Sequence, residues 1–281
     1  MALGSGHQTV TTGANFIPEI WSKELQRARE SNLVASNLFK RFDVDVKSKG
    51  DTIHVPLISN LSVNAKAAST QVTFNAPTEN VVDININKHY ECSFLIEDVL
   101  DAQSAYNLAM EYKDKQAYAL AKQMDTDVLA LYTNITQTVS SSGTPPTDSN
   151  ILRAVQYLDD ADAPAKDRVF IMRPSLKSTL LAIDRYVDTN FVGMGDMPVK
   201  TGLFGQRYGL AFYVSTNIPL DGSSNPVNIV AHKETYALAV QKDLVMRNDY
   251  IIEYLSNAYV GQVLYGVKTY RSDHACLVYS N

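Results

Sequence analysis

The sequence predicts an α+β protein that has one very long helix and one long extended arm. Residues 104–134 carry apolar side chains at helical spacing, with no proline or glycine among them. Residues 47–88 place two strand-like patterns on either side of a stretch of small, polar residues. After residue 140, short helical and strand patterns alternate, as in a mixed domain built around a sheet.

The composition is that of an ordinary globular chain. The 281 residues are 45% hydrophobic and 20% charged, which allows a large core in one or two domains. The net charge is −5 without a basic cluster, which disfavours binding to nucleic acid or to an anionic membrane. No apolar segment approaches the ~20 residues of a membrane span, and the first residues do not resemble a secretory signal. Cys92 and Cys276 fit no metal or redox motif and are interpreted as reduced, buried thiols.

The N-terminal segment is predicted to be an arm followed by a helix. Residues 1–16 are small and polar, so we expect them to be flexible or to become ordered on contact. Pro18 suits the first turn of a helix. The apolar residues that then recur at helical spacing are Ile20, Trp21, Leu25, Ala28 and Leu33.

The extended arm spans about Lys47 to Lys88. Loops longer than about a dozen residues are uncommon unless they are functional or disordered. No glycine occurs between Asp51 and Ser142, so the arm is not a flexible glycine linker. The strand residues that alternate with polar neighbours are Ile53, Val55 and Leu57 before the loop, and Val82, Ile84 and Ile86 after it.

The middle of this arm has little that it can bury within its own chain. At 3.3 Å per residue, a side of up to about 18 residues reaches about 60 Å, which is a distance between subunits. We therefore predict that the arm contacts another subunit. The candidate contact residues are Ser62, Asn64, Lys66, Thr70, Val72 and Phe74.

The helix at 104–134 is expected to be the backbone of its domain. Ser104 is the expected N-cap, and at 1.5 Å per residue the helix would be about 46 Å long. Residues 94–100 before it are predicted to be a strand end and a helical turn.

The second half begins at a linker rich in serine and proline at 140–150. We predict helices at 149–161 and 174–184, where Pro174 suits a first turn. The remaining predictions are a buried strand at 168–172, a loop at 186–203, further segments of the sheet at 209–219 and 228–241, and closing strands at 249–257 and 259–280.

No motif indicates catalysis or cofactor binding. The sequence has no nucleophile elbow, zinc-protease, phosphate-loop or dinucleotide-binding pattern. Ser272, Asp273 and His274 are the residue types of a catalytic triad, but consecutive strand residues point to opposite faces. We therefore interpret His274 as a core or edge residue, and we predict no catalytic residue, no cofactor and no metal site.

For two groups of charged residues, a binding role stays open beside the simpler interpretation of a surface position. Asp125 and Asp127 are interpreted as a solvated or interface pair on the long helix, although partners from elsewhere would allow them to bind a metal. Lys66 is the only lysine between Asp51 and Asn87. Its simple interpretation is a solvated side chain, and the alternative is a role in gripping a neighbouring molecule.

The order of these elements resembles the major capsid proteins of tailed bacteriophages, which have the Hong Kong ninety-seven-type capsid fold. Residues 168–174, with the helix pattern after them, resemble the strand-proline-helix unit of that family's axial domain. Residues 205–219 resemble its segment of glycine, strand and Ser/Asn-Pro. Residues 261–278 resemble the closing strands of its peripheral domain.

The resemblance implies a division of the chain into parts. These are an N-terminal arm and helix at 1–46, an extended β-hairpin loop at 47–90, a peripheral domain with the long spine helix at 91–139, an axial domain at 140–250, and closing strands that return to the peripheral domain at 251–281.

The resemblance also implies a structural protein without enzymatic activity. Copies of the chain would form the hexamers and pentamers of an icosahedral shell, the virion capsid, after synthesis in the host bacterial cytoplasm. Implied partners are other copies, separate scaffolding, portal and cement proteins, and enclosed double-stranded DNA that is not bound sequence-specifically; no membrane is involved. Some family members join a loop lysine to a neighbour's asparagine, and Lys66 lies in a suitable region. Two alternatives stay open: an encapsulin-like nanocompartment shell and, from another class, a small hydrolase or metal enzyme.

Overall fold

The structure, a computed structural model, describes most of the chain after its N-terminal segment. The described residues are 30, 33–43, 50–58, 61–72, 74–76, 79–104, 108–140, 142–183, 186 and 205–280. The predicted arm at 1–16, most of the helix predicted from Pro18 and nearly all of the loop predicted at 186–203 lie outside them.

The described residues form α-helices, short 3-10 helices and strands. The helices are α1 (Ala35–Leu38), α3 (Asp98–Gln103), α4 (Leu108–Leu129), α5 (Asp148–Asp160) and α6 (Pro174–Leu181), and the 3-10 helices are η2 (Ala130–Asn134), η3 (Ile252–Tyr254) and η4 (Ser272–His274). The strands are β1 (Lys40–Arg41), β2 (Thr52–Ile58), β3 (Glu79–Asn85), β4 (Lys88–Glu97), β5 (Thr138–Val139), β6 (Arg168–Met172), β7 (Gln206–Arg207), β8 (Leu210–Val214), β9 (Val227–His232), β10 (Tyr236–Ile251), β11 (Ser256–Thr269) and β12 (Ala275–Tyr279).

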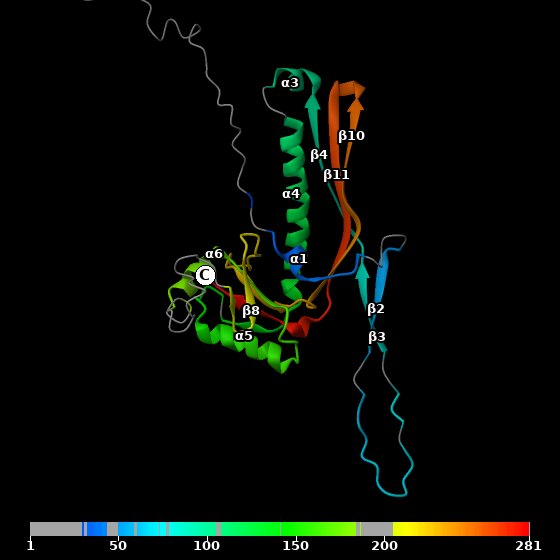
Figure 1. Ribbon diagram of the computed structural model, residues 1–281, viewed down its shortest axis with the longest axis vertical. Helices are drawn as coiled ribbons and strands as arrows, with labels where there is room; N and C mark the ends of the chain where they lie inside the picture. Colours follow the sequence, from blue (N-terminus) through cyan, green and yellow to red (C-terminus); the bar gives the residue numbers. More distant parts are fainter. Residues whose placement is uncertain are drawn as a thin grey trace, which may run out of the picture.

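The described strands form three sheets (Figure 1). The first sheet has the order β1-β10-β11-β4, the second has the order β5-β12-β9-β6-β8-β7, and the third is the hairpin of β2 and β3. The helix α4 runs along the first sheet in an elongated unit, α5 and α6 lie beside the second sheet, and the β2–β3 hairpin projects away from both. The α+β class is confirmed.

The long helix is shorter than predicted. It has 22 residues, or about 33 Å at 1.5 Å per residue, and η2 continues it to Asn134. Ser104, the expected N-cap, is instead the C-terminal cap of α3, where its backbone is extended. Gly261 of β11 allows α4 to lie close to the first sheet, because an added Cβ there would be 3.0 Å from the Gln116 side chain.

The second sheet is buried on both faces, which explains the continuous apolar run in its central strand. All five residues of β6 are buried. Phe170 and Met172 share a core cluster with side chains of α5 and α6. Val169 and Ile171 share another with side chains of α4, β10 and β11. The two sheets therefore meet in one core, at the C-terminal end of α4.

The elements predicted in the second half are confirmed except at turns. The helices expected at 149–161 and 174–184 and the strand expected at 168–172 correspond to α5, α6 and β6. The segment of the sheet expected at 209–219 contains β8, and the residues after Val214 form a turn that leads to a proline.

A long hairpin, β10–β11, replaces the closing strands that we predicted at 249–257 and 259–280. After β10, η3 turns the chain, and Leu255 adopts a left-handed conformation with φ 45°. The apolar residues of this turn look like a strand in the sequence, yet they are exposed. Since β10 begins at Tyr236, the chain enters the first sheet well before the predicted boundary at 250, and β12 lies in the second sheet.

The strand β10 joins the packed part of the first sheet to its exposed end. It is 16 residues long; its first residues are buried, and most of its later ones are exposed. Its pairing with β11 shifts register between Val240 and Lys242, and again between Lys242 and Val245. These shifts mark the place where β10 leaves the core.

The base of the β2–β3 hairpin packs on the first sheet. Ile84 and Ile86 form a buried cluster with Ala237 and Ala239 of β10. Gly266 of β11 pairs with Ala239, and an added Cβ on this glycine would lie 2.3 Å from the backbone oxygen of the last residue of β3. Small residues at these positions therefore allow the backbone of the hairpin to pack directly against the sheet.

A buried carboxylate joins three parts of the fold. Asp125 of α4 is 0% exposed, so its interpretation as solvated is wrong. It accepts hydrogen bonds from the Ser36 backbone N–H in α1 and from the Asn217 side-chain amide after β8, both at 3.1 Å. Burial raises the pKa of Asp125 above its ordinary value of 3.8, and these hydrogen bonds oppose the rise.

We expect Asp125→Asn to change how stability depends on pH. Because the pKa of this group is raised on folding, the folded protein binds the proton more tightly than the unfolded chain does, so the group's contribution to the free energy of unfolding falls as pH rises above 3.8. Urea unfolding should show the wild type gaining stability relative to Asp125→Asn from about pH 7 to about pH 4. Asp160→Asn, an exposed carboxylate on α5, is the charge-matched control. Identical pH dependence in the two variants would contradict the prediction.

Candidate assembly interface

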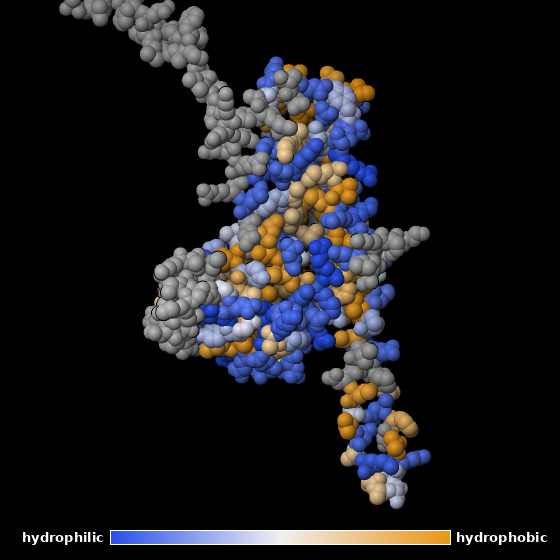
Figure 2. All heavy atoms as spheres, in the orientation of Figure 1, coloured by the Kyte–Doolittle hydropathy of each residue, from blue (hydrophilic) through white to orange (hydrophobic). Residues whose placement is uncertain are grey.

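The loop between β2 and β3 carries apolar side chains that are uncovered in the single chain. We call residues 61–76 the arm loop. Val63 is 98% exposed and Phe74 is 91% exposed, and Leu61 and Val72 are also largely exposed. Figure 2 shows hydrophobic atoms on a projection that stands clear of the body of the molecule. Large exposed apolar side chains on such a projection are typical of a contact surface.

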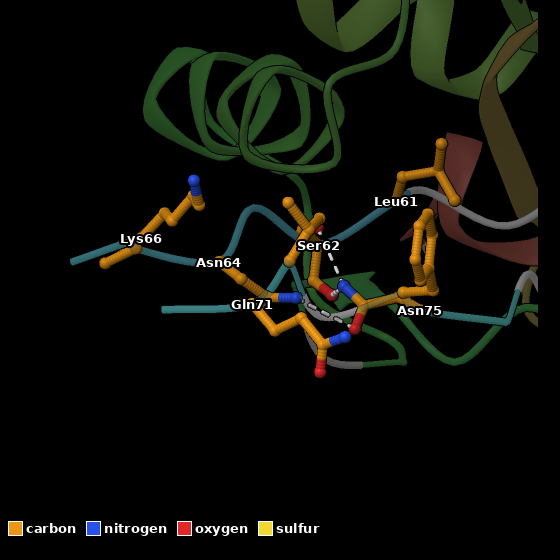
Figure 3. A pocket seen from close by; sticks show the side chains of 9 residues that line it. Leu61, Ser62, Asn64, Lys66, Gln71 and Asn75 are labelled. Carbon is orange, nitrogen blue, oxygen red and sulfur yellow. Dashed lines mark hydrogen bonds between the residues drawn. The ribbon is translucent and has the colours of Figure 1, made fainter. Parts of the chain in front are cut away.

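A staple of neutral side chains holds the two limbs of the arm loop together (Figure 3). The Asn75 side-chain amide donates to the Ser62 carbonyl at 3.0 Å and to the Ser62 hydroxyl at 2.8 Å. The Asn64 amide donates to Asn75 Oδ1 at 3.0 Å. One asparagine thus joins residues that are 11 and 13 positions away. The loop therefore has a defined shape before it meets any partner.

The end of the arm loop is a tight turn. The Thr70 backbone N–H and hydroxyl both donate to the Ala67 carbonyl, at 3.4 and 2.7 Å. Ser69, within the turn, is left-handed with φ 64°. Between the limbs lies a cleft of about 320 Å³, and its lining includes Leu61, Lys66, Gln71 and Phe74.

The six predicted contact residues all lie on this loop, but they have different local roles. Ser62 and Asn64 belong to the staple, and Thr70 belongs to the turn. Val72 and Phe74 expose their apolar side chains. Lys66 is exposed near the turn and makes no ion pair with the described residues. Their contact with a neighbour stays a prediction. Asn75 was missed because its role requires two limbs whose pairing the sequence does not display.

A second exposed apolar surface lies at the far end of the β10–β11 hairpin. It is brought together by α3 and η3, because the Asp98 backbone N–H donates to the Leu255 carbonyl at 3.1 Å. We call it the tip cluster. Its members, each between 52% and 77% exposed, are Val99, Leu100, Ile252, Tyr254 and Leu255. Sequence reasoning missed this surface because its residues were interpreted as parts of a strand and of a helical turn.

Asp127 is also part of a buried cluster, so its interpretation as solvated is wrong. This carboxylate is 8% exposed. It accepts a hydrogen bond from the Tyr265 hydroxyl at 2.8 Å and pairs with Lys88 Nζ at 3.0 Å. Burial, together with the adjacent Asp127, raises the pKa of Tyr265. The cluster ties α4 to β11 and to the start of β4, just after the extended hairpin.

The side chains of His232, His274 and Cys276, in or beside the second sheet, are buried. His274 is buried, as interpreted, and its ring centre lies 5.8 Å from that of His232. Burial lowers the pKa of His232 and raises the pKa of the Cys276 thiol to about 12. Within the described ranges, no group of three or more His, Cys, Asp and Glu side chains is placed to hold a metal ion. No helix in that part of the chain is long and apolar enough to cross a membrane.

Comparison with known families identifies the class of protein. A family model described as phage capsid protein matches residues 95–278, which is more than half of the chain. The chain belongs to the phage capsid protein family. The matched region of this capsid protein begins in β4 and ends in β12, so it includes the spine helix α4, the long hairpin and the second sheet.

Solved structures show that the capsid protein shares its fold with phage proteins. A structure from Mycobacterium phage Che8 is 23% identical, with a TM-score of 0.82 over 94% of this chain and 97% of the other. The capsid of the cyanophage P-SCSP1u is 19% identical, with a TM-score of 0.81 over 99% and 97%. The capsid of the native GTA particle is 12% identical, with a TM-score of 0.71 over 99% of both chains. A search of curated proteins returned no match.

These comparisons confirm the predicted capsid fold and the predicted structural capsid role. They favour neither alternative, the nanocompartment shell or the small enzyme. The division into domains and the contact residues stay predictions.

Proposed function

We propose that this capsid protein is the major shell subunit of a tailed bacteriophage and that its copies form the hexamers and pentamers of an icosahedral shell around double-stranded DNA. The arm loop carries the proposal, because Val63 and Phe74 are almost wholly exposed on a loop whose shape is already fixed. Membership of the capsid family and the shared fold support it. The role is structural, with no enzymatic step, and synthesis takes place in the host bacterial cytoplasm.

Burial of the arm loop on a neighbour contributes directly to assembly. Fully burying a valine or phenylalanine side chain stabilises by about 1.5–3 kcal/mol. The Asn75 staple reduces the conformational entropy that is lost on contact, because the two limbs are already held together. A projection that binds a different surface of the next copy makes a heterologous contact, and repeated contacts of this kind close into rings.

The two larger sheets take different positions in the proposed shell. The second sheet, with α5 and α6, is the axial domain and surrounds the local symmetry axes. The first sheet, with α4, is the peripheral domain and meets adjacent capsomers. The exposed tip cluster at the end of the first sheet supports this assignment, because it offers a second apolar surface for contact between copies.

Other copies of the chain are the main partners in this proposal. The net charge of −5 suits a shell that encloses DNA without binding its sequence. Separate scaffolding, portal and cement proteins complete the proposed set of partners. A covalent link through Lys66 is not part of the proposal, because no asparagine of a neighbour has been identified for it.

The proposal is tested by the size of the purified protein. Size-exclusion chromatography and negative-stain electron microscopy should show capsomers or closed particles, because the arm loop and the tip cluster are covered only by other copies. A small enzyme would instead elute as a small, discrete oligomer. Stable monomers under every assembly condition tried would contradict the proposed function.

A further inference from the structure

At two turns the chain passes directly from a strand of one larger sheet to a strand of the other. It leaves the second sheet after β9 and enters the first with β10, and it returns between β11 and β12. We call residues 232–236 and 269–275 the crossing segments. Because strands of both sheets continue directly from these segments, contacts between the segments help to hold the sheets in their relative orientation.

Thr235 joins the two crossing segments. This residue is 0% exposed. Its carbonyl accepts hydrogen bonds from the backbone N–H groups of Tyr270 at 2.8 Å and Arg271 at 3.2 Å. Its hydroxyl donates to the His274 carbonyl at 2.9 Å, and its own N–H donates to the His232 carbonyl at 2.9 Å. One buried threonine is therefore bonded to both histidine residues and to the start of the second crossing segment.

Each crossing segment carries one buried histidine. His232 is 5% exposed and His274 is 6% exposed, and their ring centres are 5.8 Å apart. Two positive charges at this separation repel each other, and they do so more strongly in a buried place than in water. The observed arrangement of the crossing segments therefore favours neutral rings.

The hydrogen bonding of His232 also requires a neutral ring. Its Nδ1 accepts a hydrogen bond from the Glu234 backbone N–H at 3.3 Å. Both nitrogens of a charged imidazole are donors, so protonation of this ring removes that hydrogen bond. Burial lowers the pKa of His232, and the nearby His274 and Arg168 lower it further, whereas Glu234 and Asp167 oppose the decrease.

The ring of His274 has one nitrogen that is unpaired among the described residues. This nitrogen, Nδ1, is buried. The other nitrogen, Nε2, lies 3.8 Å from Asp273 Oδ2, whose side chain is 59% exposed, so water screens its charge. A second proton on this ring would occupy Nδ1, where it would be a buried donor without an acceptor.

The other charged groups around the pair do not offer a free carboxylate in the crossing segments. Glu234 is paired with Lys40 Nζ at 2.8 Å, and this hydrogen bond holds the pKa of Glu234 below its ordinary value. Arg168 is paired with Asp159 at 2.7 Å. Lys233 and Arg271, the remaining charged residues of the crossing segments, add positive charge, which disfavours a further proton on either ring.

We propose that His232 and His274 form a pH-sensitive switch at the joint between the two larger sheets. While both rings are neutral, the hydrogen bonds of Thr235 keep the crossing segments together. When a ring gains a second proton, the Glu234 hydrogen bond is lost or an unpaired donor is buried, and the crossing segments separate locally. This property belongs to the single chain and does not depend on the proposed shell.

The direction of the pH dependence follows from the surroundings of His232. Because the pKa of this group is lowered in the folded chain, an opened joint binds the proton more tightly than the closed joint does. The closed joint is therefore at its most stable above the ordinary histidine pKa of 6.5, and opening becomes easier as pH falls below that value.

Hydrogen–deuterium exchange of the unassembled wild-type chain tests the proposal. The Tyr270 and Arg271 amides report on the joint, because both donate to Thr235. After correction for the intrinsic exchange rate, their protection should fall about threefold to tenfold between about pH 7.5 and about pH 5.5, since one group with an opened-state pKa near 6.5 gives at most about tenfold. Peptides from β6 should keep their protection. Equal protection of the two amides at both pH values overturns the proposal, and so does an equal fall in β6.

His232→Asn separates the switch from other effects of acid. The asparagine Oδ1 can accept the Glu234 N–H but cannot be protonated, so the fall in protection should shrink to less than about twofold. His274→Asn, which removes the second ring, should also reduce the fall. His89→Gln, at an exposed histidine on β4, is the matched control and should keep the wild-type fall. An unreduced fall in His232→Asn overturns the proposal, and the wild-type measurement can overturn it even where a variant does not fold.

Discussion

Deletion of residues 62–76 is expected to leave a folded chain that no longer assembles. The hydrogen bonds described above for Ser62, Thr70 and Asn75 stay within the loop, and no residue of the deleted segment belongs to a core cluster. The deletion leaves residues 59, 60, 61, 77 and 78 between β2 and β3, and hairpin loops of up to about five residues are common. Thermal unfolding followed by circular dichroism should match the wild type, while electron microscopy should show no particles.

A second variant keeps the length of the loop and removes only its most exposed apolar side chains. It tests whether assembly depends on those side chains rather than on the length of the loop. The double variant Val63→Ser with Phe74→Ser keeps every residue of the staple and of the turn, but it removes about 3–6 kcal/mol of burial from each contact. It should also fail to form particles at concentrations at which the wild type assembles. Unchanged particles from the deletion would refute the role given to the arm loop.

Gly266→Ala is expected to destabilise the folded chain by about 3 kcal/mol, because the new Cβ would meet backbone rather than a movable side chain. The nearest atoms are the Asn85 oxygen at 2.3 Å, the Asn85 carbonyl carbon at 2.9 Å and the Ile86 Cα at 3.1 Å. Relief requires the hairpin base to lift from the sheet, which would expose Ile84 and Ile86. Differential scanning fluorimetry of the unassembled protein should show a melting temperature lower by about 6–12 °C.

The same substitution at Gly222 is the matched control. An added Cβ there has nothing within 4 Å and the backbone is not left-handed, so Gly222→Ala should melt within about 2 °C of the wild type. Equal melting of the two variants would mean that the hairpin is not seated on the sheet as described. Gly266→Ala displaces the base of the arm. We therefore expect this variant to lose particle formation under conditions in which its chain is still folded.

Elements with a strong local pattern could be predicted from the sequence. The strand β6 is a continuous apolar run because the second sheet is covered on both faces, and Pro174 does stand at the start of α6. The hairpin strands β2 and β3 follow from alternation of residues, and the long loop between them follows from its mostly small, polar residues. These features are encoded by neighbouring residues, so a single sequence is enough.

Features that depend on distant residues could not be predicted. Asp125 and Asp127 look like surface acids in the sequence, and they are buried only because Asn217 and Tyr265 are brought to them by the fold. The apolar turn at Ile252 and Leu255 was interpreted as a strand, because its exposed residues are of the same types as those buried in a core. The length and composition of the loop were enough to indicate the candidate residues on the arm. The hydrogen bonds of Asn75 that shape the loop could not be predicted, because they join residues from its two sides.

The register shifts in β10 have a mechanical consequence. A shell with both pentamers and hexamers requires one polypeptide to adapt to more than one local curvature. Extra residues in a paired strand bend it and loosen its ladder locally. Because both irregularities fall between Val240 and Val245, we expect bending to be concentrated where β10 leaves the core. In the proposed shell, we expect the outer end of the molecule to change its angle at this point while the packing around β6 stays the same.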